Sequence, residues 1–181
     1  NRIYIEEATE IKKELYLGLV FDRSSESIMV VASTEGGMSV EEIAKKKPES
    51  IIRSKIEVAV GMQNFQAREI AFGLGIEPEL IRRASETING CYRAFSELDA
   101  TMVEVNPLVI SNQDQILALD CKMSFDNNAL FRRNQVSELR DKTQENSSEV
   151  YASDRGLNYV SLDGNIGNII NGAGLAMASM D

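Results

Sequence analysis

Residues 103 to 122, VEVNPLVISNQDQILALDCK, carry four polar side chains that could do chemistry: Glu104, Asn106, Asp120 and Lys122. Carboxylate and amide oxygens are the ligands that hard cations prefer. Aliphatic residues alternate with polar ones on both sides of the polar run SNQDQ, which is typical of two strands joined by a turn. The stretch therefore predicts a β-hairpin that places several oxygen ligands close together.

The register of this hairpin decides which side chains meet. A turn centred on Gln113 places Asn106 opposite Asp120 and Glu104 opposite Lys122, all on one face. Directly opposed residues have Cβ atoms about 5 Å apart, so an amide and a carboxylate oxygen can hold one small cation between them. Magnesium fits, because it takes one or two protein oxygens and fills its other positions with water and phosphate. The alternative is a solvated hairpin face with a Glu104–Lys122 cross-strand pair.

The composition of the 181 residues excludes several classes of function. The chain has 28 Asp and Glu against 19 Lys and Arg, a net charge of −9, which argues against a nucleic-acid partner. It has no histidine, so sites with a Ser-His or Cys-His pair are excluded. Cys91 and Cys121 have no metal-ligand spacing, and no apolar run approaches the about 20 residues that a membrane-spanning helix needs. This composition suits a metal-bound anionic substrate.

Apolar periodicity predicts an α+β chain. We expect a strand over residues 2–8, a break into charge over 9–14, and a hairpin over 15–22 and 27–34. Helices are expected over 40–47, 65–75 and 78–98, the last beginning at Pro78. A further amphipathic helix is expected from residue 129 and ends in a polar tract near 150. Residues 157–181 predict two short strands and a Gly-rich turn that opens an apolar helix.

Six segments resemble, in their order and spacing, the β subunits of the succinate–CoA ligase (succinyl-CoA synthetase) family. They are IEEATEIKKELYLGLVFDRSS, STEGG, VEVNPLVI, LALDCK, NALFR and LNYVSLDGNIGNIINGAGLAM. The resemblance implies the later, larger subdomain of an ATP-grasp fold over residues 1–145 and a linker over 146–156. It also implies that residues 157–181 are the truncated start of a flavodoxin-like α/β CoA-ligase domain.

The same resemblance implies an activity. The family interconverts succinate, CoA and a nucleoside triphosphate with succinyl-CoA, the diphosphate and phosphate, a step of the tricarboxylic acid cycle. Its phosphoryl group passes through a histidine of an α subunit, which fits a chain without histidine. The implied ligase uses Mg²⁺ with ATP or GTP and assembles as an αβ heterodimer or α2β2, without nucleic acid or membrane. We expect it in the cytoplasm of a bacterium or in the mitochondrial matrix of a eukaryote.

Individual residues of the hairpin match functional positions of the family. Asn106 and Asp120 match its two magnesium ligands, the pair that the register already places face to face. Glu104 matches the catalytic glutamate beside the phosphohistidine near the nucleotide site. A carboxylate there accepts a hydrogen bond from the second imidazole nitrogen and stabilises positive charge. Cys121 stands where family members usually have a smaller residue.

Positions outside the hairpin match the family's other binding sites. Nucleotide-binding positions of the family match Glu6, Thr9 and Glu14. Without the resemblance, the segment that contains them is typical of a charged loop between strands. Asn171, followed by the Gly-rich turn 172–174, matches the substrate segment near the carboxylate site, and such a turn before a helix presents free N–H groups to an anion. STEGG, residues 33–37, is a loop near the site or a plain turn.

The family's N-terminal lysine, its phosphate-covering loop and a later glycine loop are not among these residues. We therefore expect a fragment that is inactive alone. Two other functions compete with succinate–CoA ligation. One is a sister ligase for malate or another dicarboxylate, and the other is a module that docks an α-type partner without binding nucleotide. The presence of Glu104, Asn106 and Asp120 argues against the docking module.

Overall fold

The computed structural model describes residues 3, 5, 7–140, 142–143, 145–162 and 164–180. The chain divides into two compact units, Asn1–Glu138 and Leu139–Asp181, which are described separately below. Of the helices in the described part, none combines the length and the apolar character needed to cross a membrane.

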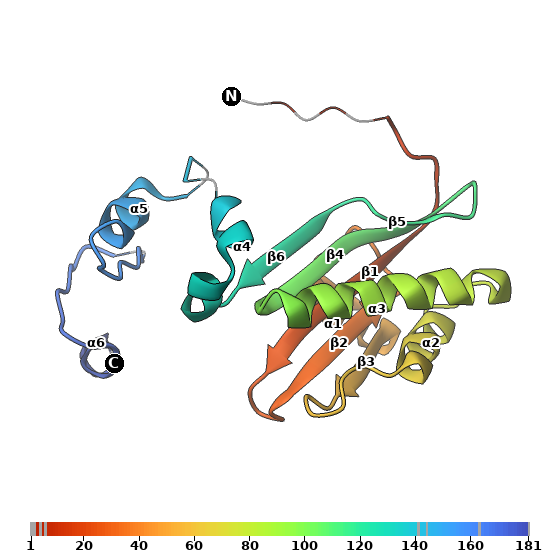
Figure 1. The fold of residues 1–181 in the computed structure, drawn as a ribbon, viewed down its shortest axis with the longest axis horizontal. Coiled ribbons are helices and arrows are strands. Elements are labelled where there is room, and N and C mark those ends of the chain that lie inside the picture. Colours follow the sequence, from red (N-terminus) through yellow and green to blue (C-terminus); the bar gives the residue numbers. More distant parts are fainter. Residues whose placement is uncertain are drawn as a thin grey trace. The chain divides into compact units, whose positions relative to one another are not determined.

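A six-stranded antiparallel sheet forms the centre of the first unit (Figure 1). Its strands are β1 (Ile11–Asp22), β2 (Ser27–Ser33), β3 (Ile51–Ile56), β4 (Ala100–Ser111), β5 (Ile116–Ala118) and β6 (Cys121–Phe125). They follow the order β3-β2-β1-β4-β5, and β6 pairs with the other end of β4. The strands predicted at 15–22, 27–34 and in the 103–122 hairpin are thereby confirmed.

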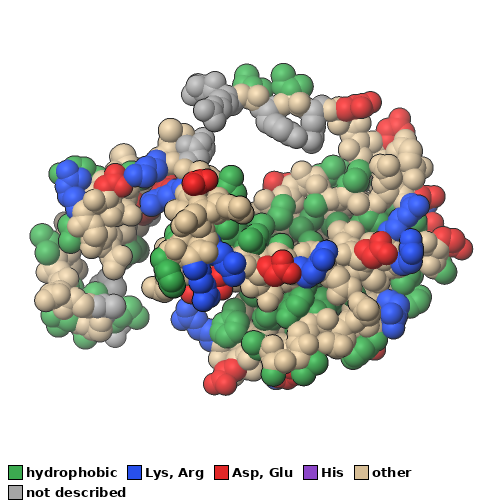
Figure 2. All heavy atoms as spheres, in the orientation of Figure 1, with side chains coloured by type: hydrophobic (Ala, Val, Ile, Leu, Met, Phe, Trp, Pro, Cys, Tyr) green, Lys and Arg blue, Asp and Glu red, His purple; other side chains and the backbone are tan. Residues whose placement is uncertain are grey.

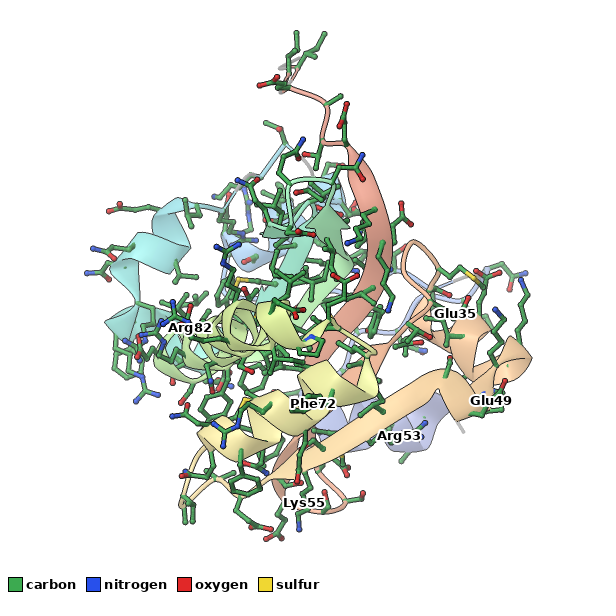
Figure 3. The ribbon with its side chains drawn as sticks, turned by 90° about the vertical axis from the view of Figure 1, so that its right-hand side faces the viewer. Glu35, Glu49, Arg53, Lys55, Phe72 and Arg82 are labelled. Atoms are coloured by element: carbon green, nitrogen blue, oxygen red, sulfur yellow. The ribbon has the colours of Figure 1, made fainter. Side chains whose placement is uncertain are left out.

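Helices lie on both faces of this sheet. Those over the sheet are α1 (Val40–Lys46), α2 (Asn64–Gly73) and α3 (Ile81–Glu97). The unit also contains α4 (Asn134–Glu138) and the 3-10 turns η1 (Pro48–Ser50), η2 (Pro78–Leu80) and η3 (Asn127–Arg132). Figure 3 shows Phe72 of α2 and Arg82 of α3 on one side of the sheet, and α1 on the opposite side. One face of the sheet is therefore covered by α2 and α3, and the opposite face carries α1.

The hydrophobic core lies between the sheet and the pair α2 and α3. Leu15, Leu17 and Leu19 alternate along β1 and are fully buried against this helical layer, where α3 contributes Ile88. The outer surface of α3 instead alternates basic and acidic residues (Figure 2), and an example is the Arg82–Glu86 ion pair at 3.7 Å. This amphipathic pattern explains why α3 packs with one face on the sheet.

The second unit contains α5 (Ser147–Ser153) and α6 (Ala173–Met180). Asn146 caps α5 by accepting a hydrogen bond from the N–H of Ser148 at 2.8 Å. Ion pairs join Arg140 to Glu145 and Lys142 to Asp154, both at 2.6 Å. Large apolar side chains of this unit are exposed, among them Leu157, Val160, Leu162, Ile166 and Ile169.

Several predicted elements were wrong. β1 begins at Ile11, inside the charged run that we expected to break the strand, and the described residues of 2–8 form no strand. The strand tolerates the charged residues because their side chains reach partners outside it. Lys13 Nζ, for example, donates to the carbonyl of Leu74 at 2.8 Å. The amphipathic helix expected from residue 129 is instead the 3-10 turn η3 and the short helix α4, and α5 begins within the expected polar tract. The described residues of 157–172 contain no strand, whereas the helix predicted after the Gly-rich turn is α6.

Candidate functional site

The hairpin has the predicted register. Glu104 pairs with Lys122 where β4 meets β6, and Leu108 pairs with Ala118 where β4 meets β5. Between these two ladders the N–H of Asn106 donates to the carbonyl of Asp120 at 3.2 Å. Asn106 and Asp120 are therefore directly opposed, as the sequence indicated.

The side chain of Asn106 is fixed by the 34–39 loop between β2 and α1. Its Oδ1 accepts from the N–H of Gly37 at 2.9 Å, and its Nδ2 donates to the carbonyl of Met38 at 2.9 Å. Both ends of the amide are thus oriented by backbone groups. An amide oxygen has two lone pairs, so Oδ1 keeps one for a further partner such as a cation.

Two glycines let this loop lie directly on β1. A Cβ at Gly36 would lie 2.5 Å from the backbone N of Leu15 and 2.6 Å from the carbonyl carbon of Glu14. Gly37 has a positive φ of 72°, and a Cβ there would lie 2.8 Å from Oε2 of Glu14. The loop therefore contacts Glu14 through Gly37 and the Asn106 amide through its backbone. STEGG is accordingly part of a loop against the hairpin rather than a plain turn.

The 34–39 loop is also attached on its outer side. Oε1 of Glu35 forms an ion pair with Lys47 Nζ at 2.8 Å, and Figure 3 shows Glu35 on the α1 side of the sheet. At the end of the loop, Ser39 caps α1 by accepting from the N–H of Glu42 at 3.3 Å. The loop is therefore held between the hairpin and α1.

Glu104 lies two residues before Asn106 on β4, and the buried phenol of Tyr16 lies beside it. Tyr16 of β1 is 4% exposed. Its pKa is raised well above the ordinary value by burial, then by Glu104 as a negative charge and as a hydrogen-bond partner, and further by Glu41 of α1. Among the described residues no ion pair joins Glu104 to Lys122. The cross-strand Glu104–Lys122 pair that was the alternative to a metal site is therefore not seen in this part of the chain.

Other predicted site residues lie elsewhere. Glu6 is outside the described residues. Thr9 precedes β1, near the hairpin turn where Asn112 donates to the carbonyl of Glu10 at 2.9 Å, and the structure does not bring it to Asn106. Asn171 is exposed in the second unit, just before α6. Of the predicted set, Asn106 and Asp120 are directly opposed, Glu104 lies two residues before Asn106 on β4, and Glu14 lies against Gly37 of the 34–39 loop.

The sequence did not indicate Tyr16 or the backbone of Met38 as part of the site, and it left the STEGG loop that contains Gly37 open between the site and a plain turn. Two adjacent glycines between a strand and a capping serine were a usable signal for a closely packed loop. Tyr16 gave no signal, because an aromatic residue inside an apolar strand is typical of any sheet.

The ligands available for a cation fit magnesium. Within the described residues no three His, Cys, Asp or Glu side chains gather into a group that could hold a metal. Asn106 and the exposed Asp120 could instead supply one or two oxygen ligands. Magnesium is usually held in this way, with waters and substrate phosphates completing the octahedron.

Comparison with known proteins identifies the family. The model of the ATP-grasp domain matches residues 1–110. The chain belongs to the ATP-grasp family. The antiparallel sheet with α2 and α3 on one face is accordingly an ATP-grasp fold, as predicted.

Relatives of this ATP-grasp chain include ligase subunits. The “Probable malate–CoA ligase subunit beta” of Mesorhizobium japonicum is 60% identical over 181 residues, which are 100% of this chain and 46% of that protein. The ADP-forming succinate–CoA ligase subunit beta of Bacillus cereus is 51% identical over 181 residues, 100% of this chain and 47% of that protein. The chain thus spans about half the length of these curated relatives.

A solved structure shares the ATP-grasp fold at low identity. The ATP citrate lyase of Methanothrix soehngenii, in complex with citrate and coenzyme A, matches with a TM-score of 0.52 and 17% identity. The match covers 82% of this chain and 34% of that one. At this identity the likeness concerns the fold alone.

Proposed function

We propose that the chain is the nucleotide- and magnesium-binding part of the β subunit of a nucleoside-diphosphate-forming succinate–CoA ligase. The observation that carries the proposal is the directly opposed pair of Asn106 and Asp120, with the Asn106 amide oriented by the 34–39 loop. Membership of the ATP-grasp family and the two CoA-ligase relatives support it.

In this proposal the hairpin holds the metal and the 34–39 loop orients one of its ligands. Asn106 Oδ1 and the Asp120 carboxylate would hold Mg²⁺, which would neutralise charge on the nucleotide phosphates. Glu104 accepts a hydrogen bond from the imidazole of the α-subunit histidine that carries the phosphoryl group, and so fixes its tautomer.

The remaining predicted residues bind substrates. Glu14, next to Gly37, accepts hydrogen bonds from the ribose or base of ATP or GTP, together with Glu6 and Thr9. Asn171 and the Gly-rich turn after it bind the carboxylate substrate in a CoA-ligase domain that starts near residue 157. The bounds 1–145, 146–156 and 157–181 are part of the proposal.

Malate is the second candidate for the acid. The observation that favours it is the 60% identity to the Mesorhizobium japonicum protein, against 51% to the Bacillus cereus subunit. Both acids carry two carboxylates, and the oxygen ligands of the hairpin contact the nucleotide rather than the acid. The site therefore supports a dicarboxylate–CoA ligase in either case.

The test reconstitutes the complete β subunit with its α subunit and CoA. Formation of acyl-CoA is measured with succinate or malate and with Mg-ATP or Mg-GTP, and incorporation of labelled phosphate into the α subunit is followed in parallel. We expect succinyl-CoA and an acid-labile, base-stable label on the α-subunit histidine. Malyl-CoA in place of succinyl-CoA would select the second candidate. Absence of both acyl-CoA products, with no labelled histidine, would refute the proposal.

A further inference from the structure

Tyr16 faces an irregularity of β4 at the candidate site. β4 carries one extra residue between its pairs with Leu15 and Leu17, so Asn106 and Pro107 together oppose Tyr16. Such a bulge re-aims the side chains around it. Tyr16 is therefore the β1 residue directly across from the proposed metal ligand, on the sheet face that carries α1.

The phenol of Tyr16 lies along β1 toward Glu104. A Cβ at Gly18 would be 2.7 Å from the Tyr16 hydroxyl oxygen and 3.2 Å from the ring atoms Cε1 and Cζ, so the end of the ring covers Gly18. Gly18 is the direct partner of Glu104 in the β1–β4 ladder. The hydroxyl therefore ends beside the Glu104 side chain, and glycine at position 18 provides the space for it.

The surroundings make this phenol a rigid hydrogen-bond donor. Tyr16 is 4% exposed, and its Cα partner on the other side is the buried Ser33 of β2. A phenol is protonated at neutral pH, because its ordinary pKa is about 10, so the hydroxyl is a hydrogen-bond donor. A buried tyrosine has few torsions to fix, whereas a glutamate side chain has more freedom to lose. The phenol is thus suited to orient the carboxylate.

We propose that Tyr16 is a positioning residue whose hydroxyl donates to one carboxylate oxygen of Glu104 and directs the other oxygen toward the histidine of the α subunit. This inference rests on the proposed function of Glu104. Within the described residues no ion pair joins Glu104 to Lys122, its partner on β6, so the carboxylate is not held from that side. Tyr16 itself does not touch the phosphoryl group.

The test separates the two ways of phosphorylating the α-subunit histidine in the reconstituted complex. One uses Mg-nucleotide, the step in which Glu104 takes part, and the other uses succinyl-CoA with phosphate. We expect Tyr16→Phe to slow labelling from the nucleotide by about tenfold, with an unchanged KM for the nucleotide. Labelling from succinyl-CoA and phosphate should keep its rate. A loss of stability alone would slow both labelling reactions.

Two further variants complete the test. In a Glu104→Gln background, Tyr16→Phe should slow labelling from the nucleotide by a further factor of less than about two, because the hydroxyl acts through the carboxylate. Tyr92→Phe is a matched control: its hydroxyl lies against Gly61, where a Cβ would be 3.1 Å away, and it belongs to α3 on the other sheet face.

The outcomes separate the inference from the function on which it rests. If Glu104→Gln slows the nucleotide step and Tyr16→Phe does not, the positioning role is overturned while the proposed function stands. Additive effects of Tyr16→Phe and Glu104→Gln, or an equal loss in Tyr92→Phe, would also overturn it. If Glu104→Gln itself leaves the nucleotide step unchanged, the proposed role of Glu104 fails first.

Discussion

Asn106 and Asp120, the two proposed magnesium ligands, are held in different ways. The Asn106 amide is oriented by two backbone groups of the 34–39 loop, so it is fixed before any ion binds. Asp120 is exposed, and it is tied to β4 through its backbone carbonyl. None of the side-chain hydrogen bonds or ion pairs described for the chain uses its carboxylate. The negative charge of Asp120 therefore stabilises little of the fold and is available to a cation.

Substitution of Asp120 by Asn in the complete enzyme tests whether its carboxylate serves the cation rather than the stability of the fold. The change removes one charge from the cation's ligands and keeps the size of the side chain. Phosphoryl transfer should fall by about 100-fold or more at saturating magnesium, while the free energy of unfolding changes by less than about 0.5 kcal/mol. Initial rates and urea unfolding measure the two effects.

Asp114→Asn is the control on the same hairpin. Asp114 lies in the turn with a φ of 57°, a conformation that Asn tolerates, and pairs with Lys12 on the surface. We expect it to keep full turnover. Full turnover of Asp120→Asn would contradict the metal role.

At the scale of single residues, the opposition of Asn106 and Asp120 was predictable because it follows from local rules. A turn centre and the two-residue period of a strand fix which residues oppose each other. The placement of Tyr16 beside Glu104 was not predictable in this way. It depends on the pairing of β1 with β4 and on the bulge at Asn106 and Pro107, which no local pattern indicates.

The 34–39 loop is the element on which the geometry of the site depends. It starts where β2 ends, packs through Gly36 on the backbone of β1, binds Asn106 of β4, and ends at the cap of α1. It therefore connects three strands and a helix within six residues. Its close approach to β1 requires that position 36 carry no side chain.

Gly36→Ala should move this loop away from Asn106. The added Cβ would lie 2.5 Å from a backbone atom of Leu15, which cannot turn away as a flexible side chain can. We expect a loss of about 1–3 kcal/mol in the free energy of unfolding, as for an overpacked site. The hydrogen exchange of the Gly37 N–H should also accelerate, because that group donates to Asn106.

Gly90→Ala is the matched control for this substitution. A Cβ at Gly90 meets no atom within 4 Å, and the residue lies inside α3. It should raise stability by about 0.5–1 kcal/mol and leave the Gly37 exchange rate unchanged. Normal exchange at Gly37 in Gly36→Ala would show that the loop tolerates a side chain.

Among the elements, periodicity located α1, α2 and α3 but misplaced the start of β1 and the short helices after β6. α3 was predictable because its apolar spacing is sustained over four turns, although it begins at Ile81 and the predicted start at Pro78 is the 3-10 turn η2. The region after β6 was not, since Asp126 and Asn146 cap new short helices inside a run that looked continuous. β1 extends through Lys12 and Lys13 because tertiary partners bind their charges.

The two units of the molecule differ in how they bury their apolar residues. The first has a closed core between the sheet and the pair α2 and α3. In the second, Leu157, Val160 and Ile169 are exposed by 62%, 72% and 104%. Exposed apolar residues in such number are typical of a surface that packs against another part of a protein. We expect them to be covered by further residues in a complete subunit, since the relatives are about twice as long.

The last prediction concerns the 181 residues taken alone. Grasp-type catalysis depends on positioning and charge neutralisation from two sides of the nucleotide, and the proposed site here supplies a metal clamp from one side. The chain also has no histidine that could accept the phosphoryl group as an acid-labile intermediate. Incubated with labelled Mg-ATP or Mg-GTP, succinate and CoA, it should form no succinyl-CoA and no labelled protein.

Addition of the α subunit alone should not restore activity, because the missing lysine and phosphate-covering loop are expected in the β chain. Limited proteolysis of the same sample provides an independent check of folding. Residues 11–138 should resist cleavage because they contain the closed core, whereas cuts should fall within 157–172, where the described backbone has no helix or strand. A protected core without activity is the expected pair of results. Acid-labile, base-stable label on the isolated chain would contradict the account, since it requires a phosphoryl acceptor that the sequence does not contain.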